Sequence, residues 1–293
     1  MGIMRFNFRS QALGRYVDVT IVYPTDNYSY YDLYAEKRGG AAENPVLLTE
    51  KKGIYQKGMK FQTVYLIHGG GDDDTLTYRY TNAERYAQEN NVMLVTPNVA
   101  NSFGVDTQYG VNYQRFISEE LPVVIQSLFA SSDKREDNFI VGYAMGGNVA
   151  LGTAIMNPDK YCHCVDMSGG IGMTFNTETM KKELEGDHFR NFLPVYNTSF
   201  GEAKDFEGSK YDLNYWVKKY KDEGVEMPKF TLICGSDEFI RARMDDDARL
   251  MKEAGLDVDY IIADGYKHDF NLWEDYIRII LSEILPLKRK SVL

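Results

Sequence analysis

Short runs of apolar residues alternate with longer patterned segments along the whole chain. Seven of these runs are short and rich in β-branched or aromatic residues, so they predict β-strands. The predicted strands are residues 17–23, 63–67, 92–96, 138–141, 164–167, 230–234 and 259–263. Several of them are apolar at almost every position, which is typical of parallel strands that are covered on both faces.

Five segments between these runs have patterns that predict helices. They are residues 82–89, 114–129, 147–156, 244–254 and 272–285. Because strands and helices alternate, we expect the α/β class with a doubly wound, mostly parallel sheet. The chain shows neither an internal repeat nor a low-complexity linker, so residues 1–293 are expected to form a single domain.

Two long segments interrupt this alternation. Residues 26–60 are rich in tyrosine, and residues 172–227 carry many aromatic side chains between two predicted core strands. Both are longer than ordinary connections in a compact domain. We therefore expect residues 26–60 to form a tyrosine-rich insertion and residues 172–227 to form an aromatic-rich cap or lid. Any single aromatic residue there is more commonly part of the insertion's own core than of a ligand site.

The charge and composition exclude several classes of partner. The formal net charge is −10, with no basic block outside residues 288–290, so a nucleic-acid partner is not expected. The N-terminal residues lack the apolar run of roughly seven residues of a signal peptide, and no stretch reaches the roughly 18 apolar residues of a membrane span. Three cysteines, an odd and low number, fit a reducing compartment. We expect a cytoplasmic protein without a membrane partner.

A glycine-rich turn at residues 139–150, FIVGYAMGGNVA, resembles the turn that presents the nucleophile of serine hydrolases. An apolar predicted strand ends at Gly142, and Gly146 and Gly147 open a predicted helix. In the G-x-S-x-G pattern the middle residue is a serine, whereas this chain has Ala144 there. A methyl group can neither attack a carbonyl carbon nor donate a hydrogen bond.

The other parts of such a site occur in the chain in the order that the fold requires: oxyanion loop, nucleophile, acid, base. The apolar run 64–67 leads into His68 and three glycines, and glycines let a backbone N–H approach a substrate closely. The expected oxyanion donors are the N–H groups of Gly70 and Met145. The glycine spacing does not match the G-x-G-x-x-G dinucleotide loop.

His268 is the candidate base, because it lies between the last predicted strand and the last predicted helix. The three other histidines fit this role less well. His68 belongs to the glycine turn, His163 lies on a predicted buried strand, and His188 lies in the predicted cap. A lone histidine is more often structural, but this one completes an ordered set.

The acid is expected in the turn after the strand FTLICG, where Asp237 and Glu238 are adjacent. Either carboxylate could orient the imidazole and stabilise its protonated form. Adjacent side chains point in different directions, so one of the two is expected to reach His268.

Neither a metal nor another cofactor is expected. Residues 72–74 are three consecutive aspartates, but their spacing matches no EF-hand loop, and a solvated acidic loop is the expected structure. Cys162 and Cys164 lack a second cysteine pair, so they are expected in the core and not at a zinc ion.

Several stretches are similar to one branch of the α/β-hydrolases. They are YLIHGGGDDDTLTYRYTNAERYA, VTPNVANSFGVDTQYGVNY, EELP, KREDNFIVGYAMGGNVA, FGEAKDF and GYKHDFNLW. Together they run from Tyr65 to near the end of the chain. The chain resembles the esterase D-like, or tributyrin esterase, branch, which is itself similar to carbohydrate acetyl esterases and feruloyl (cinnamoyl) esterases.

The resemblance implies a role for each candidate residue. The family serine falls on Ala144, its histidine on His268 and its oxyanion donors on Gly70 and Met145. Its acid is usually an aspartate three residues after the strand-ending glycine. That count falls on Glu238, one position after Asp237, so both carboxylates stay candidates and Glu238 is favoured. The implied activity is hydrolysis of small-acyl (acetyl or butyryl) or feruloyl-type esters, including esters of carbohydrates. The resemblance also implies a homo-oligomer.

Alanine at position 144 leaves every other catalytic role filled. We hypothesise that it is an engineered replacement of serine in an active esterase, so that this chain is inactive. The alternatives are a natural pseudoenzyme that binds an acylated sugar or a phenolic ligand, and a thioesterase or peptidase on the same fold.

Overall fold

The computed structural model describes residues 2–25, 57–173, 186, 193–201 and 208–292. Its centre is an eight-stranded sheet with the order β1-β2-β4-β3-β5-β6-β7-β8. The strands are β1 (Gly2–Arg9), β2 (Tyr16–Tyr23), β3 (Thr63–Ile67), β4 (Met93–Pro97), β5 (Asn138–Tyr143), β6 (His163–Met167), β7 (Lys229–Gly235) and β8 (Val258–Ala263). The six strands β3 to β8 pair in parallel, and β1 and β2 pair antiparallel at one edge. The predicted doubly wound, mostly parallel sheet is confirmed.

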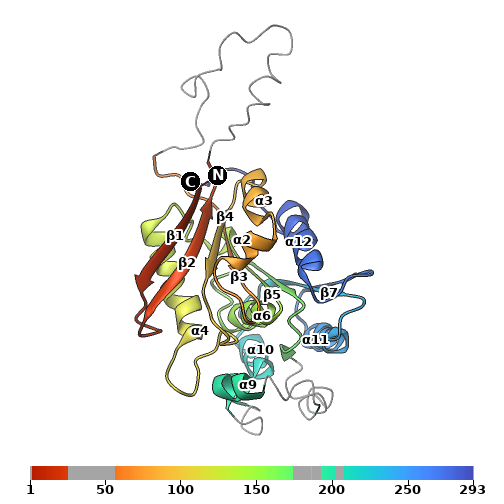
Figure 1. The fold of residues 1–293 in the computed structure, drawn as a ribbon. Coiled ribbons are helices and arrows are strands. Elements are labelled where there is room, and N and C mark those ends of the chain that lie inside the picture. Colours follow the sequence, from red (N-terminus) through yellow and green to blue (C-terminus); the bar gives the residue numbers. More distant parts are fainter. Residues whose placement is uncertain (1, 26–56, 174–185, 187–192, 202–207, 293) are drawn as a thin grey trace, which may run out of the picture.

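Helices cover both faces of this sheet (Figure 1). They are α2 (Leu76–Tyr80), α3 (Ala83–Glu89), α4 (Tyr113–Arg115), α5 (Leu121–Leu128), α6 (Met145–Met156), α9 (Leu193–Phe200), α10 (Leu213–Asp222), α11 (Arg241–Glu253) and α12 (Phe270–Ile279). Side chains of α3 and α12 belong to one core, and side chains of α5, α6 and α11 belong to the other. Within the described ranges, no helix is long and apolar enough to cross a membrane.

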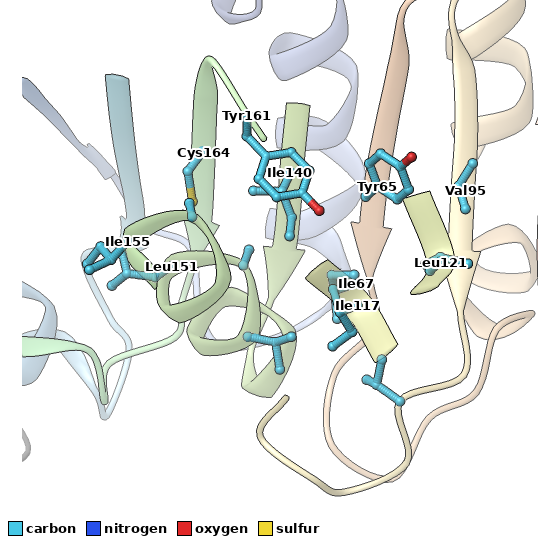
Figure 2. Packing of buried hydrophobic residues seen from close by; sticks show 14 of the residues in the cluster. Tyr65, Ile67, Val95, Ile117, Leu121, Ile140, Leu151, Ile155, Tyr161 and Cys164 are labelled. Atoms are coloured by element: carbon cyan, nitrogen blue, oxygen red, sulfur yellow. The ribbon is translucent and has the colours of Figure 1, made fainter. Parts of the chain in front are cut away.

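The two cores explain the continuous apolar runs in the sequence. On β3, Tyr65 and Ile67 face one core, whereas Val64 and Leu66 face the other. Successive side chains of a strand alternate between faces, so a strand that is buried on both faces needs apolar residues throughout. Figure 2 shows Tyr65 and Ile67 beside Ile140 of β5 on the face that α6 covers.

Strand β1 is not among the predicted strands, the first of which begins at residue 17. In β1 the half-buried Met4, Phe6 and Phe8 alternate with exposed residues. The ring of Phe6 packs edge-on against Phe129 with 5.6 Å between centroids. This period-two pattern is typical of an edge strand with one covered face.

The two predicted insertions lie partly outside the described residues. Residues 26–56 are not described, so the tyrosine-rich insertion stays a prediction. The described parts of the predicted cap include α9 and α10, and α10 packs against α6. Three aromatic side chains of this segment form a small core with Val105 of the loop after β4. They are Tyr196, Phe200 and Tyr211, and Phe103 and Ile171 pack against this core.

Glycines bring the backbones of β5 and α6 into direct contact. A Cβ atom added to Gly142 would lie 1.9 Å from the carbonyl oxygen of Gly146. A Cβ atom added to Gly146 would lie 2.2 Å from the carbonyl oxygen of Ile67 at the end of β3. No L-residue with a side chain fits at such distances without a backbone shift. The first turn of α6 is therefore held directly against the ends of β3 and β5.

Two glycines of α6 offer a matched test of this packing. We expect Gly146→Ala to lower the free energy of unfolding by about 3 kcal/mol or more, because backbone atoms must move. Gly152→Ala should raise it by roughly 0.5–1 kcal/mol, since its Cβ would meet Met156 and Leu213 side chains at 3.7 and 3.9 Å. Urea denaturation of the two variants measures the difference, and equal effects would contradict the packing described here.

Candidate active site

Position 144 forms the sharp turn between β5 and α6. Ala144 has φ 50° and ψ −126°, a conformation that costs a residue with a Cβ atom about 1–3 kcal/mol. Its N–H donates to the carbonyl oxygen of Met167 (2.8 Å), and its carbonyl oxygen accepts from the N–H of Gly147 (2.9 Å). The turn presents residue 144 to a pocket that is lined by the loops that follow several strands.

Both predicted oxyanion residues line the same pocket as Ala144. Met145 is the first residue of α6, where N–H groups have no acceptor within the helix. Gly70 follows β3, and a Cβ atom added to it would lie 3.8 Å from the Cβ of Met145. The fold thus places residues 70 and 145 side by side in the pocket wall, although 75 positions separate them in the sequence.

A buried histidine holds the glycine turn after β3. The side chain of His68 is fully buried, and burial lowers its pKa, so the imidazole is neutral. Its Nε2 accepts from the N–H of Val99 (3.0 Å), and Nδ1–H donates to the carbonyl oxygen of Gly69 (2.8 Å). These two bonds assign the proton to Nδ1 and join the turn to the loop that follows β4.

Asn101, which no sequence motif indicates, makes a second link between these loops. Its Oδ1 accepts from the N–H of Gly71 (2.7 Å). Its loop is strained, because Ala100 and Phe103 have φ values of 49° and 52°. Asn101 also lines the pocket. No local signal marks this residue, since its partner lies in another loop.

His268 pairs with Glu238 and not with Asp237. Nδ1–H of His268 donates to Oε2 of Glu238 (2.8 Å), whose carboxylate is fully buried. Oε1 of Glu238 accepts from the N–H of Gly235 (2.8 Å) and from the hydroxyl of Ser168 (2.7 Å). Asp237 is exposed, and its carboxylate accepts from the hydroxyl of the adjacent Ser236 (3.1 Å).

Aromatic rings fix the position of the imidazole. The ring of Trp273 meets it edge-on with 5.2 Å between centroids, and the ring of Phe239 lies 5.0 Å away. The His268 side chain keeps 23% of its surface exposed, so solvent or a substrate can reach it from the pocket. Packing and the bond to Glu238 together define which ring nitrogen faces the pocket.

The pocket has a volume of about 450 Å³, which exceeds what an acetyl group needs. Its lining residues are Gly70, Gly71, Asn101, Phe103, Ala144, Met145, Asn148, Ser168, Gly169, Ile171, Tyr196, Phe239, Ile240, Arg243 and His268. Phe103 and Tyr196 form an aromatic wall, with their rings 5.1 Å apart and edge-on. The buried Arg243 supplies a positive charge that neither composition nor motif had indicated.

In the acidic run after the glycine turn, Asp72 and Asp73 are partly exposed but Asp74 is buried, so the expectation of a solvated loop is wrong for Asp74. Asp74 is fully buried, and its Oδ2 accepts from the hydroxyl of Thr20 (2.7 Å). Oδ2 of Asp72 accepts from the hydroxyl of Tyr143 (3.1 Å). In the described part of the chain, no group of three or more His, Cys, Asp or Glu residues is placed to hold a metal ion.

Comparison with known proteins agrees with this geometry. Residues 53–188 match the family model described as "Putative esterase". The chain is 26% identical over 284 residues to an acetyl esterase from Caldicellulosiruptor saccharolyticus, covering 94% of this chain and 96% of that protein. The chain is thus similar in sequence to esterases over most of its length.

Solved structures of serine hydrolases share the fold of this chain over almost its whole length. Substrate-bound fluorophosphonate-binding serine hydrolase F from Staphylococcus aureus has a TM-score of 0.74 and 24% identity, covering 97% of this chain and 98% of that chain. An S-formylglutathione hydrolase from Staphylococcus aureus has a TM-score of 0.73 and 23% identity, with the same coverage of 97% and 98%. The predicted α/β-hydrolase fold is confirmed.

The neutral His68 predicts a pH dependence of stability. Its pKa is lowered in the folded state, so the unfolded chain binds the proton first as the pH falls below about 6.5. The contribution of His68 to stability is therefore complete above that pH and is lost below it. We expect the free energy of unfolding to fall less between about pH 7.5 and about pH 5.5 in His68→Gln than in the parent chain. Urea denaturation at both pH values tests this, and an equal fall in the two proteins would contradict it.

Proposed function

We propose that this site hydrolyses carboxylic esters by two-step acyl transfer through a serine at position 144, and that Ala144 replaces that serine. One observation carries the proposal: the imidazole of His268, held by buried Glu238, lines the same pocket as the strained turn at position 144. A nucleophile position, a base and an orienting carboxylate are the parts that nucleophilic catalysis requires.

In the first step, the Oγ of the serine attacks the ester carbonyl carbon. Nδ1 of His268 is engaged with Glu238, so Nε2 accepts the serine proton. The N–H groups of Gly70 and Met145 donate to the carbonyl oxygen as it gains negative charge. The intermediate then expels the alkoxide, which takes the proton from Nε2 and leaves as the alcohol, while the acyl group stays on the serine.

In the second step, a water molecule takes the place of the alcohol. Nε2 of His268 accepts a proton from the water as its oxygen attacks the acyl carbon. Collapse of this second intermediate releases the carboxylic acid and returns the proton to the serine oxygen. Throughout both steps the side chain of Glu238 orients the imidazole and stabilises the imidazolium.

Alanine at position 144 removes the nucleophile and preserves the turn. We propose that it is an engineered substitution, because the base, the acid and the glycine turn are all in place around it. The chain is then inactive but able to bind its substrate. In a natural pseudoenzyme, the alternative, the same pocket would bind an acylated sugar or a phenolic ligand without turnover.

The proposed substrates are esters with a small acyl group, with hydroxycinnamoyl esters as the next class and a carbohydrate as the alcohol. The small acyl group is supported by the similarity to an acetyl esterase. The aromatic wall of Phe103 and Tyr196 supports stacking of a ring within a pocket of about 450 Å³. A thioester is the second candidate, because an S-formylglutathione hydrolase has the same fold.

The cellular location and the oligomeric state of the protein are also proposals. Cys162, Cys164 and Cys234 are free cysteines, which supports the cytoplasm. The homo-oligomer rests on the family resemblance alone.

Reverting position 144 tests the function. We expect Ala144→Ser to hydrolyse p-nitrophenyl acetate, p-nitrophenyl butyrate or methyl ferulate, with a rate at least about a thousandfold above that of the alanine chain. Initial rates of the two purified proteins measure this, and the preferred ester identifies the acyl class. Hydrolysis by the alanine chain at the rate of the serine variant would refute the proposed nucleophile.

The two adjacent carboxylates provide a matched pair in the Ala144→Ser background. Glu238→Gln should lower kcat by about 100-fold or more, because the imidazole loses the charge that holds its tautomer and stabilises its protonated form. Asp237→Asn should leave kcat within about twofold, since that side chain is exposed and bonded to Ser236. A larger loss for Asp237→Asn than for Glu238→Gln would assign the acid to Asp237.

A further inference from the structure

Ser168, which follows β6, holds a conformation that glycine would adopt with less strain. Its φ is 61°, in the left-handed region that residues with a Cβ atom disfavour. It precedes two glycines, is fully buried and lines the pocket. Its N–H donates to the carbonyl oxygen of Ile233 on the neighbouring β7 (2.9 Å), which holds the strained backbone in place. Strain of this kind persists where the surroundings enforce it, often at functional sites.

The hydroxyl of Ser168 contacts the acid directly. It donates to Oε1 of Glu238 (2.7 Å), which also accepts from the N–H of Gly235 (2.8 Å). The other carboxylate oxygen, Oε2, accepts from His268 (2.8 Å). The indole N–H of Trp273 points at the Ser168 oxygen (3.4 Å), so the hydroxyl proton is directed toward the carboxylate.

We infer that Ser168 is a positioning residue for catalysis, which acts through Glu238. Its hydroxyl fixes the carboxylate in the rotation that presents Oε2 to His268, and it stabilises the ionised form that the imidazolium requires. Glycine would fit the backbone but lacks the hydroxyl, which explains why a strained serine stands here. The inference rests on the proposed function, because it assigns Ser168 to the same reaction.

Two substitutions of Ser168 in the Ala144→Ser background separate catalysis from stability. Both Ser168→Ala and Ser168→Gly delete the hydroxyl, but Ser168→Gly also relieves the backbone strain. We expect both to lower kcat by about 10- to 100-fold with KM within about twofold. Ser168→Gly should unfold at a urea concentration no lower than that of Ser168→Ala. Unchanged kcat in both variants would overturn the inference.

A double-mutant cycle shows whether Ser168 acts through Glu238. Where Glu238→Gln is already present, Ser168→Ala should lower kcat by less than about threefold, because the charged group that it positions has gone. If the two losses multiply instead, Ser168 acts independently of Glu238 and the inference fails. As a control, Ser102→Ala deletes another buried hydroxyl, which donates to the carbonyl oxygen of Val99 (2.6 Å) and does not contact Glu238. Any loss of kcat in Ser102→Ala should multiply with the loss in Glu238→Gln.

One readout does not depend on activity and so distinguishes failure of the inference from failure of the proposed function. The Nδ1–H proton of His268 can be observed by proton NMR in the alanine chain, where Glu238→Gln identifies it by moving or abolishing its low-field signal. We expect Ser168→Ala to move or broaden the same signal, whereas Ser102→Ala should leave it unchanged. An unchanged signal in Ser168→Ala would overturn the inference even if the Ala144→Ser variant hydrolyses no ester.

Discussion

The site depends on the direct backbone contact between the start of α6 and the ends of β3 and β5. Glycines at positions 142 and 146 make this contact possible, because a Cβ atom at either position would overlap a carbonyl oxygen. Residue 144 lies in the sharp turn between the two elements, with a positive φ of 50°, at the pocket wall. The same contact brings the first N–H groups of α6 beside the glycine turn that follows β3. One steric constraint thus places both the proposed nucleophile position and the proposed oxyanion donors.

Hydrogen bonds between loops fix the other residues of the site relative to the turn at residue 144. His68 and Asn101 join the glycine turn to the loop after β4, while Ser168 and Gly235 bind one oxygen of Glu238. These residues lie at or shortly after the ends of β3, β4, β6 and β7. The carboxyl ends of these parallel strands meet at one edge of the sheet, where α/β proteins usually bind their ligands. The imidazole of His268 is therefore oriented by Glu238, whose carboxylate is itself held from the ends of two other strand segments.

The parts of the fold that could be predicted are those that one short segment determines. Buried parallel strands are apolar at nearly every position, so residues 63–67 were predicted with the bounds observed. Helix α6 is predicted from residue 147 but begins at Met145, because its first turn is fixed by the packing of Gly146 against the distant residue Ile67. Strand β1 was missed, since its pattern has a single covered face.

The parts of the site that could not be predicted depend on contacts between distant residues. Asn101 binds a residue 30 positions away, and Ser168 binds one 70 positions away, so neither has a local signature. The choice between Asp237 and Glu238 depends on which side chain turns inward, and burial of Glu238 against His268 decides which of them makes the contact. Asp74 looked like a solvated acid but is buried beside Thr20 on β2.

The central claim is that the turn after β5 presents residue 144 as the nucleophile position of this pocket. Its most direct test is intact-mass and peptide mass spectrometry after incubation of the alanine chain and Ala144→Ser with a fluorophosphonate. The account predicts one covalent adduct on the serine variant, mapped to position 144, and none in the pocket of the alanine chain. A folded serine variant that stays unlabelled, or an adduct on Ser168 in both proteins, would contradict it.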